Sequence, residues 1–316
     1  MSLPPLLQHL RLPVIGAPMF LLSGPELVIA QCTSGIVGSF PALNARPQSL
    51  LDEWLDRITG ALREWNGKHP ERPAAPFAVN QIVHRSNSRL EHDVALCVKY
   101  RVPLLITSLG ARPEVYAAAH SYGGIVLHDV INLAFARKAI EKGADGLVAV
   151  AAGAGGHAGI TSPFALIQEI RGFFDGPLAL SGAIATGGAV LAAQAMGADL
   201  AYIGSAMIAT REANAAEAYK RMIVECSSAD IVYTDRITGV HGNYLKPSLL
   251  AAGLDPEHLP AANPGAMDFG PGGKRAWKDI WGAGQGIGAI DRVVPAAELI
   301  DRLAQQYTAA KRRLAA

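Results

Sequence analysis

The sequence predicts an α/β protein, a TIM-type (β/α)8 barrel with a smaller inserted C-terminal subdomain. Over the first 210 residues, eight short runs rich in Val, Ile, Leu or Ala alternate with amphipathic helical stretches. The runs are apolar throughout, as expected for parallel strands that are covered on both faces. A length of 316 residues suits a barrel of about 250 residues plus an insertion.

Each predicted strand runs into a turn that contains Gly, Asn or Pro, and a helical stretch follows most of these turns. The strands are expected at 13–17, 35–39, 77–80, 103–107, 125–128, 146–151, 178–181 and 201–204, and clear helices at 50–64, 88–99, 133–142, 163–174 and 187–196. A doubly wound open parallel sheet is the competing architecture. Its dinucleotide-binding version needs G-x-G-x-x-G after the first strand, and Ile15-Gly16-Ala17-Pro18-Met19 lacks that spacing.

The composition and the repeat pattern of the chain change after Thr210. Residues 230–285 are rich in Gly, Pro, Asn and Asp and show no further strand–helix repeat. We therefore expect residues 1–215 to form the barrel, completed by the C-terminal segment 287–316. Residues 216–286 would form an inserted substrate-binding or lid subdomain.

Composition argues against several classes of protein. The net charge is +1 and the charges are dispersed, so nucleic acid is not an expected partner. The apolar stretches are far shorter than a bilayer span and the first residues lack a signal-peptide pattern, so we expect no membrane association and a cytoplasmic location. The three cysteines form no C-x-x-C pair, which favours buried free thiols over a metal or redox site.

A Gly-rich turn that ends in a single histidine, Gly153-Ala154-Gly155-Gly156-His157, precedes two strands that end at small-residue turns, Ser181-Gly182-Ala183 and Gly204-Ser205. Over residues 144–209 the only Lys or Arg is Arg171, so a phosphate bound here must be held by backbone N–H groups and helix dipoles. Barrels favour phosphate sites in the loops after strands seven and eight, which are these two turns. The pattern predicts a phosphorylated cofactor.

Two polar side chains at predicted strand ends are candidates for the chemistry. Small neighbours leave the His157 ring open, which favours an acid/base or a hydrogen-bond donor; a structural donor to a nearby carbonyl is the alternative. Asn80 ends an apolar strand, where its amide offers a donor and an acceptor to a planar heterocycle; a helix or turn cap is the alternative. Asp145 and Asp199 occupy Gly-Ala-Asp turns at strand amino ends, on the opposite side of the barrel.

A series of short motifs spans nearly the whole chain. They are Ala17-Pro18-Met19, Pro76-Phe77-Ala78-Val79-Asn80, Gly155-Gly156-His157-Ala158-Gly159, Ser181-Gly182-Ala183-Ile184-Ala185-Thr186-Gly187, Gly197-Ala198-Asp199, Ile203-Gly204-Ser205 through Ala209-Thr210-Arg211-Glu212, and Trp281-Gly282-Ala283-Gly284-Gln285-Gly286. As a set they resemble the FMN-dependent nitronate monooxygenases, formerly called 2-nitropropane dioxygenases. Flavin-dependent enoyl-acyl carrier protein reductases and NADH:quinone reductases are related to that family.

The resemblance implies noncovalently bound FMN, with the family's histidine at His157 beside the reactive edge of the isoalloxazine ring. It implies cofactor contacts for Ala17, Pro18, Met19, Asn80, His128, Gly156, Ser181, Gly182, Ala183, Gly204, Ser205, Gly284 and Gln285, the phosphate lying on the Gly182–Ala183 and Gly204–Ser205 turns. Two positions depart from the family. Gly153 stands where many relatives have an acidic residue, and His128-Asp129 stands where they have a Lys or Gln. A lost cation near the flavin pyrimidine bears on redox tuning.

The resemblance leaves three functions to distinguish. The first is oxidation of an alkyl nitronate by O2 to a carbonyl compound and nitrite, with His157 as a donor to the nitronate oxygens or as the base toward a neutral nitroalkane. The second is an FMN-dependent NAD(P)H reductase of a quinone or enoyl thioester, and the lack of a second nucleotide fingerprint favours the first. The third is a barrel that only binds a phosphorylated metabolite. Assembly as a homodimer is left open.

Overall fold

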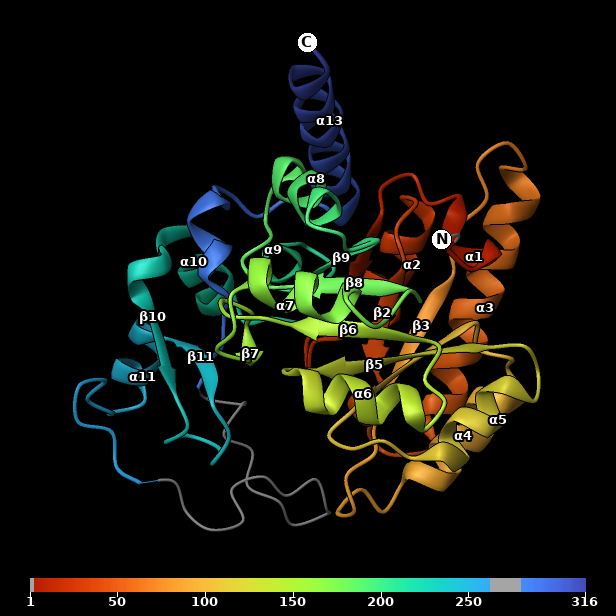
Figure 1. Ribbon diagram of the computed structural model, residues 1–316, viewed down its shortest axis with the longest axis horizontal. Coiled ribbons are helices and arrows are strands. Elements are labelled where there is room, and N and C mark those ends of the chain that lie inside the picture. Colours follow the sequence, from red (N-terminus) through yellow and green to blue (C-terminus); the bar gives the residue numbers. More distant parts are fainter. Residues whose placement is uncertain (1–2, 262–279) are drawn as a thin grey trace.

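The computed structural model describes residues 3–261 and 280–316 and contains the predicted barrel (Figure 1). Eight parallel strands pair in the order β1-β9-β8-β6-β5-β4-β3-β2, and a bridge between Ile15 and Val37 joins the two ends of this order. The barrel strands are β1 (Val14–Gly16), β2 (Gly38–Pro41), β3 (Phe77–Ile82), β4 (Leu104–Ser108), β5 (Ile125–Val130), β6 (Gly146–Val150), β8 (Leu178–Ser181) and β9 (Leu200–Ile203). All eight predicted strands belong to this closed sheet. The predicted fold class is confirmed, and the open-sheet alternative is wrong.

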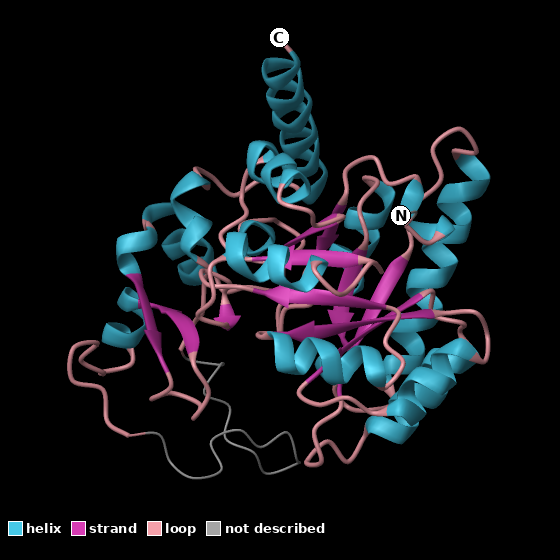
Figure 2. Cartoon of the chain, viewed as in Figure 1, coloured by secondary structure: helices cyan, strands magenta, loops and turns pink. Residues whose placement is uncertain are grey.

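Helices follow the strands and cover the outside of the barrel (Figure 2). They are α2 (Pro25–Thr33), α3 (Leu50–Lys68), α4 (Leu90–Lys99), α5 (Pro113–His120), α6 (Leu133–Glu141), α7 (Pro163–Arg171), α8 (Gly187–Ala195) and the short α9 (Ser205–Ile208), after an initial α1 (Pro5–Gln8). Side-chain caps start two of them: Asn132 accepts from Phe135 N at α6 and Thr186 from Ala189 N at α8. Such caps are worth about 1 kcal/mol each.

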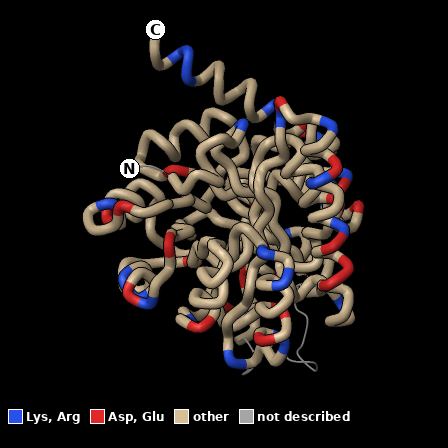
Figure 3. Tube along the Cα trace, turned by 90° about the vertical axis from the view of Figure 1, so that its right-hand side faces the viewer, with Lys and Arg blue, Asp and Glu red and all other residues tan. Residues whose placement is uncertain are grey.

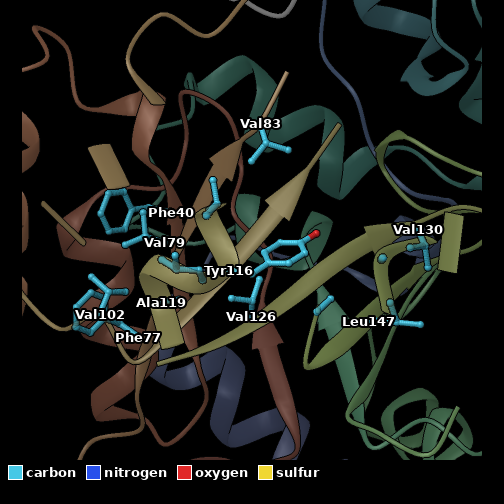
Figure 4. Packing of buried hydrophobic residues seen from close by; sticks show 14 of the residues in the cluster. Phe40, Phe77, Val79, Val83, Val102, Tyr116, Ala119, Val126, Val130 and Leu147 are labelled. Atoms are coloured by element: carbon cyan, nitrogen blue, oxygen red, sulfur yellow. The ribbon is translucent and has the colours of Figure 1, made fainter. Parts of the chain in front are cut away.

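Strand side chains alternate between the barrel interior and the layer beneath the helices. The interior cluster contains Ile106, Leu127 and Val148, whereas Val126 packs outward, next to Tyr116 of α5 (Figure 4). Full burial of such side chains stabilises the fold by roughly 1.5–3 kcal/mol each. The same alternation places one inward-facing residue at the carboxyl end of each strand, and these residues border the mouth of the barrel. They are Ala17, Pro41, Asn80, Ser108, Asp129, Val150, Ser181 and Tyr202.

The opposite end of the barrel holds the two aspartates that were predicted to be turn residues. Asp145 Oδ2 accepts from Val126 N at 2.7 Å, and Asp199 Oδ2 accepts from Leu178 N at 2.9 Å. Each carboxylate therefore fixes the start of a neighbouring strand, which confirms that prediction. Among the cysteines, Cys32 and Cys97 are buried free thiols as predicted, and Cys226 is a free thiol that is half-buried.

The segment after β9 forms a small second sheet beside the barrel, with order β10-β11-β7. Its elements are α10 (Glu217–Glu225), β10 (Ile231–Thr234), β11 (Gly242–Leu245) and α11 (Lys246–Ala251), and the third strand is β7 (Gly156–His157), from the Gly-rich turn of the barrel. The final helix α13 (Ala296–Ala315) lies along α8 (Figure 1). Residues 262–279 of the expected insertion lie outside the described residues, and the boundaries at 215 and 286 stay a prediction.

Lys and Arg are interspersed with Asp and Glu around the periphery of the molecule (Figure 3). Within residues 3–261 and 280–316, no helix combines the length and apolarity that crossing a membrane requires. The same residues contain no group of three or more His, Cys, Asp or Glu side chains arranged to hold a metal ion. The cytoplasmic location stays a prediction.

Candidate active site

A large cavity of about 2320 Å³ opens at the carboxyl ends of the barrel strands. The inward-facing ring of strand-end residues borders it, and the turns after the strands form its walls. The predicted site residues that line it are Ala17, Pro18, Met19, Asn80, His128, Gly156, His157, Ser181, Gly182, Ala183, Gly204, Ser205 and Gly284. Apart from Gly197-Ala198-Asp199, which lies at the opposite end of the barrel, the sequence motifs thus converge on one cavity although they are far apart along the chain.

The turn after β9 offers unengaged backbone donors that could hold an anion. Within the described part of the chain, the backbone N–H groups of Gly204 and Ser205 have no hydrogen-bond acceptor. The short helix α9 begins at Ser205, so the free N–H groups at its start also favour negative charge. The Ser205 Oγ accepts from Gly284 N at 2.8 Å, and this contact ties the end of the insertion to the turn.

The turn after β8 offers fewer free donors than the sequence indicated. The Ala183 N–H donates to Gly153 O at 3.2 Å, and the Gly187 N–H at the start of α8 donates to Gln306 Oε1 at 2.9 Å. Both donors are therefore engaged within the protein. A phosphate in this cavity would depend more on the Gly204–Ser205 turn than on Ala183.

The Gly-rich turn after β6 is held by the insertion. Gly153 (φ 83°) and Gly156 (φ 68°) adopt the left-handed conformation that favours glycine. Asn243 Nδ2 donates to Ala154 O at 2.6 Å, and in the register of β11 with β7 Gly242 lies opposite His157. The second sheet therefore sets the position of the histidine.

The His157 imidazole is neutral at physiological pH. Its Nε2 lies 3.2 Å from Thr238 Oγ1, and the Thr238 hydroxyl itself donates to Val240 O at 3.1 Å. Because that hydroxyl has a single proton, His157 is the donor to Thr238, so Nε2 is protonated and Nδ1 is the basic nitrogen. Burial lowers the pKa of His157 to about 4, since the charged form is poorly solvated there.

Gln285 is the predicted site residue that does not border the cavity. Its backbone N–H donates to Gly153 O at 2.9 Å, and its side-chain Oε1 would lie 3.0 Å from a Cβ placed on Gly153. A side chain at position 153 would also strain the positive φ of that residue. The family's acidic residue therefore does not fit this backbone, which accounts for Gly153.

Asn80, Ser108 and Asp129 form a hydrogen-bonded row across three neighbouring strands. Asn80 Nδ2 donates to Ile106 O at 3.1 Å and to Ser108 Oγ at 2.8 Å, and Ser108 Oγ donates to Asp129 Oδ2 at 2.5 Å. A carbonyl only accepts, so Ile106 fixes the orientation of the amide. Both amide protons are engaged, and Asn80 therefore offers a ligand an acceptor but no donor. Its position within β3 excludes the helix-cap alternative.

The side chain of His128 lies on the outer face of β5. Its Nδ1 is 2.7 Å from Thr107 Oγ1 and 3.0 Å from the Tyr116 hydroxyl, in the layer between the strands and α5. Burial lowers the pKa of this imidazole to about 4. The imidazole thus packs toward α5, and the expected contact of His128 with the cofactor stays a prediction. Because successive strand residues face opposite ways, the neighbouring Asp129 faces the interior instead.

Sequence reasoning missed Thr238 and Tyr202. Thr238 lies 81 residues from His157 in a Gly-rich segment, and no motif marks it. Tyr202 is on the inward face of β9 and borders the cavity. Because side chains alternate between the two faces of a strand, Tyr202 could have been identified in the predicted strand at 201–204 if it had been known which residues of that strand face inward.

The fold and the cavity define a TIM-barrel enzyme whose site lies at the carboxyl ends of its strands. A family model described as nitronate monooxygenase matches residues 7–306, so the chain belongs to this family of oxidoreductases, as its motifs predicted. A nitronate monooxygenase of Paraburkholderia phytofirmans is 28% identical over 93% of this chain and 92% of its own length.

Two solved structures share the fold. The nitroalkane oxidase of Streptomyces ansochromogenes superposes with a TM-score of 0.80 and 23% identity, covering 96% of this chain and 98% of that one. FabK of Thermotoga maritima superposes with a TM-score of 0.76 and 21% identity, covering 98% and 96%. At these identities the superpositions support the barrel and leave the reaction to be argued from the site.

Proposed function

We propose that this protein uses FMN to oxidise alkyl nitronates with O2, giving a carbonyl compound and nitrite. The observation that carries the proposal is the neutral His157 imidazole, held by the insertion at the edge of a cavity whose strand ends carry the family's motifs. Oxidation of neutral nitroalkanes is a second activity of the same site, if His157 removes the α-proton.

The residues present fit FMN. The unengaged N–H groups of Gly204 and Ser205 suit a phosphate without a cation, and Asn80 Oδ1 suits an N–H donor of the ring. Pro18 and Met19 border the same cavity and would pack against the ring. Bound FMN would supply the electron acceptor that the side chains of this protein lack.

His157 would bind and orient the substrate. A nitronate anion beside the ring raises the affinity of Nδ1 for a proton, and the protonated Nδ1 would donate a hydrogen bond to a nitronate oxygen. Toward a neutral nitroalkane, the basic nitrogen of His157 would take the α-proton. The Thr238 hydroxyl, 3.2 Å from Nε2, keeps the proton on Nε2, so that Nδ1 would perform both tasks.

The test is oxygen consumption by His157→Ala with nitronate and with nitroalkane. General acid–base catalysis contributes about 10²–10⁴-fold, so we expect a loss of that size with nitroalkane, a smaller loss with nitronate, and unchanged FMN content. His258→Ala is the matched control, because that side chain is 83% exposed and bonds only to Asp255 in the described structure. Unchanged oxygen consumption by His157→Ala would refute the assignment.

An FMN-dependent NAD(P)H reductase is the second candidate, favoured by the size of the cavity. At about 2320 Å³ it exceeds the roughly 300–1,000 Å³ of an ordinary ligand pocket, which leaves room for a second large ligand beside FMN. Anaerobic addition of NADH or NADPH distinguishes the two functions. Rapid bleaching of the flavin absorbance would support the reductase, no bleaching would support the oxygenase, and a colourless protein would exclude both.

A further inference from the structure

The carboxyl group of Asp129 stands where the cavity meets the barrel interior. Asp129 ends β5 in the inward phase set by Leu127, and it borders the cavity together with Asn80 and Ser108 of the two preceding strands. The function proposed above assigns no task to this carboxyl.

The hydrogen-bonded row fixes how Asp129 is bound on one side. Ile106 O orients the Asn80 amide, Asn80 donates to Ser108 Oγ, and the Ser108 proton is thereby directed to Asp129 Oδ2 at 2.5 Å. Oδ2 therefore has a donor whether the carboxyl is charged or neutral. A proton taken up by this group resides on Oδ1.

The other carboxyl oxygen has no partner. Asp129 Oδ1 is buried and makes no hydrogen bond within residues 3–261 and 280–316, and no Lys or Arg among them forms an ion pair with Asp129. A buried oxygen without a hydrogen-bond partner is unfavourable, and more so when it is charged. Burial accordingly raises the pKa of Asp129 to about 7, and the Ser108 hydrogen bond partly offsets this rise.

The groups that face Asp129 do not titrate near neutral pH. Ser108 of β4 and Val150 of β6 are not ionisable in this range, and burial raises the pKa of Tyr202, on β9, far above its usual value, with the charge of Asp129 as the second cause. The imidazole of His128 lies on the other face of β5. Among the inward-facing side chains of β4, β5, β6 and β9 at this end of the barrel, Asp129 is therefore the group that titrates near pH 7.

We propose that Asp129 is a redox-linked proton acceptor: its carboxylate takes up a proton when the flavin in the cavity is reduced, and the new Oδ1–H donates a hydrogen bond to the reduced ring. This inference rests on the proposed binding of FMN. It assigns to the protonated Asp129 the stabilisation of negative charge on the reduced ring.

Reduction of a bound flavin by two electrons and one proton would leave one negative charge on the ring. That charge raises the pKa of the nearby carboxyl, so a second proton from solvent is taken up by Asp129, and no further reactant is needed. Below pH 7 Asp129 already holds its proton in the oxidised protein. The second proton is therefore taken up above pH 7.

The test is the midpoint potential of the FMN-loaded protein, measured by dithionite titration with indicator dyes between pH 7.5 and 9. Each proton per two electrons gives about 29.6 mV per pH unit. We expect about 59 mV per pH unit for the wild-type protein and about 30 mV per pH unit for Asp129→Asn. Asp56→Asn, on the exposed face of α3, is the matched control and should keep the wild-type slope.

Ser108→Ala provides an independent variant. It removes the donor to Oδ2, so the pKa of Asp129 rises and the steep slope begins at a higher pH. A one-proton slope in the wild-type protein, or a two-proton slope kept by Asp129→Asn, would overturn the inference while leaving nitronate oxidation intact. A protein that binds no flavin would overturn the proposed function as well.

Discussion

The docking of the C-terminal helix depends on the absence of a side chain at Gly187. A Cβ at this position would lie 2.1 Å from Leu303 O and 2.2 Å from Tyr307 N, which are backbone atoms of α13. Backbone atoms cannot rotate out of the way, so Gly187→Ala must displace α13 from α8. At the next residue, Gly188, a Cβ would meet nothing closer than 3.9 Å.

The two positions therefore form a matched pair. Ala is favoured over Gly in a helix by about 0.5–1 kcal/mol, and Gly188→Ala should gain stability of this order. Gly187→Ala has the same local gain but overpacks the contact, which costs about 1–3 kcal/mol. The free energy of unfolding of Gly187→Ala should thus be about 1–3 kcal/mol below that of Gly188→Ala.

The measurement is urea unfolding followed by far-UV circular dichroism, with both variants and the wild-type protein at one pH and one FMN concentration. The slope of the transition should stay constant, so that the shift in midpoint reports stability. If Gly187→Ala were as stable as Gly188→Ala, the close approach of α13 to α8 would be refuted.

Two further predictions concern the histidines. Thr238→Val removes the hydrogen-bond partner of His157 Nε2, and since this bond is worth about 0.5–1.5 kcal/mol, kcat should fall roughly 3–10-fold with FMN content unchanged. Thr238→Ser should restore kcat. Equal kcat values for all three proteins would contradict the positioning role of Thr238. His128 has its pKa lowered from 6.5 to about 4, so its contribution to stability is complete above pH 6.5 and is lost as the pH falls toward 4. In urea unfolding this loss amounts to about 3 kcal/mol and should be missing from His128→Gln; the same pH dependence in that variant would show that His128 is not buried as a neutral group.

The barrel was predictable because its strands carry two signals at once. Both faces of each strand are buried, which gives uninterrupted apolar runs, and each run ends at a turn residue. The same property hides which residues face inward. Val126 and Leu127 are equally apolar, yet one packs against helices and the other fills the interior. The orientation of the polar pair His128-Asp129 therefore could not be deduced from the sequence.

The surroundings of His157 could not be predicted from the neighbouring sequence, for a different reason. The histidine was found because small residues surround it, but its position depends on the pairing of β7 with β11 and on Thr238, 81 residues away. Such long-range antiparallel pairing is specified by tertiary packing, because β11 lacks a hydrophobic pattern of its own that would select a partner. The motifs identified the candidate catalytic side chain but not the residue that sets its tautomer.

The site has two halves that are built by different parts of the chain. The barrel turns provide the uncharged anion-binding N–H groups, whereas the second sheet positions the histidine. Two backbone donors join the halves: Gly284 N bonds to Ser205 Oγ at 2.8 Å, and Gln285 N bonds to Gly153 O at 2.9 Å. Since both donors lie where the chain returns to the barrel, changes in β10 or β11 alter the surroundings of His157 without displacing the Gly204–Ser205 turn. Under the proposed function, selection of the substrate is thereby separable from retention of the cofactor.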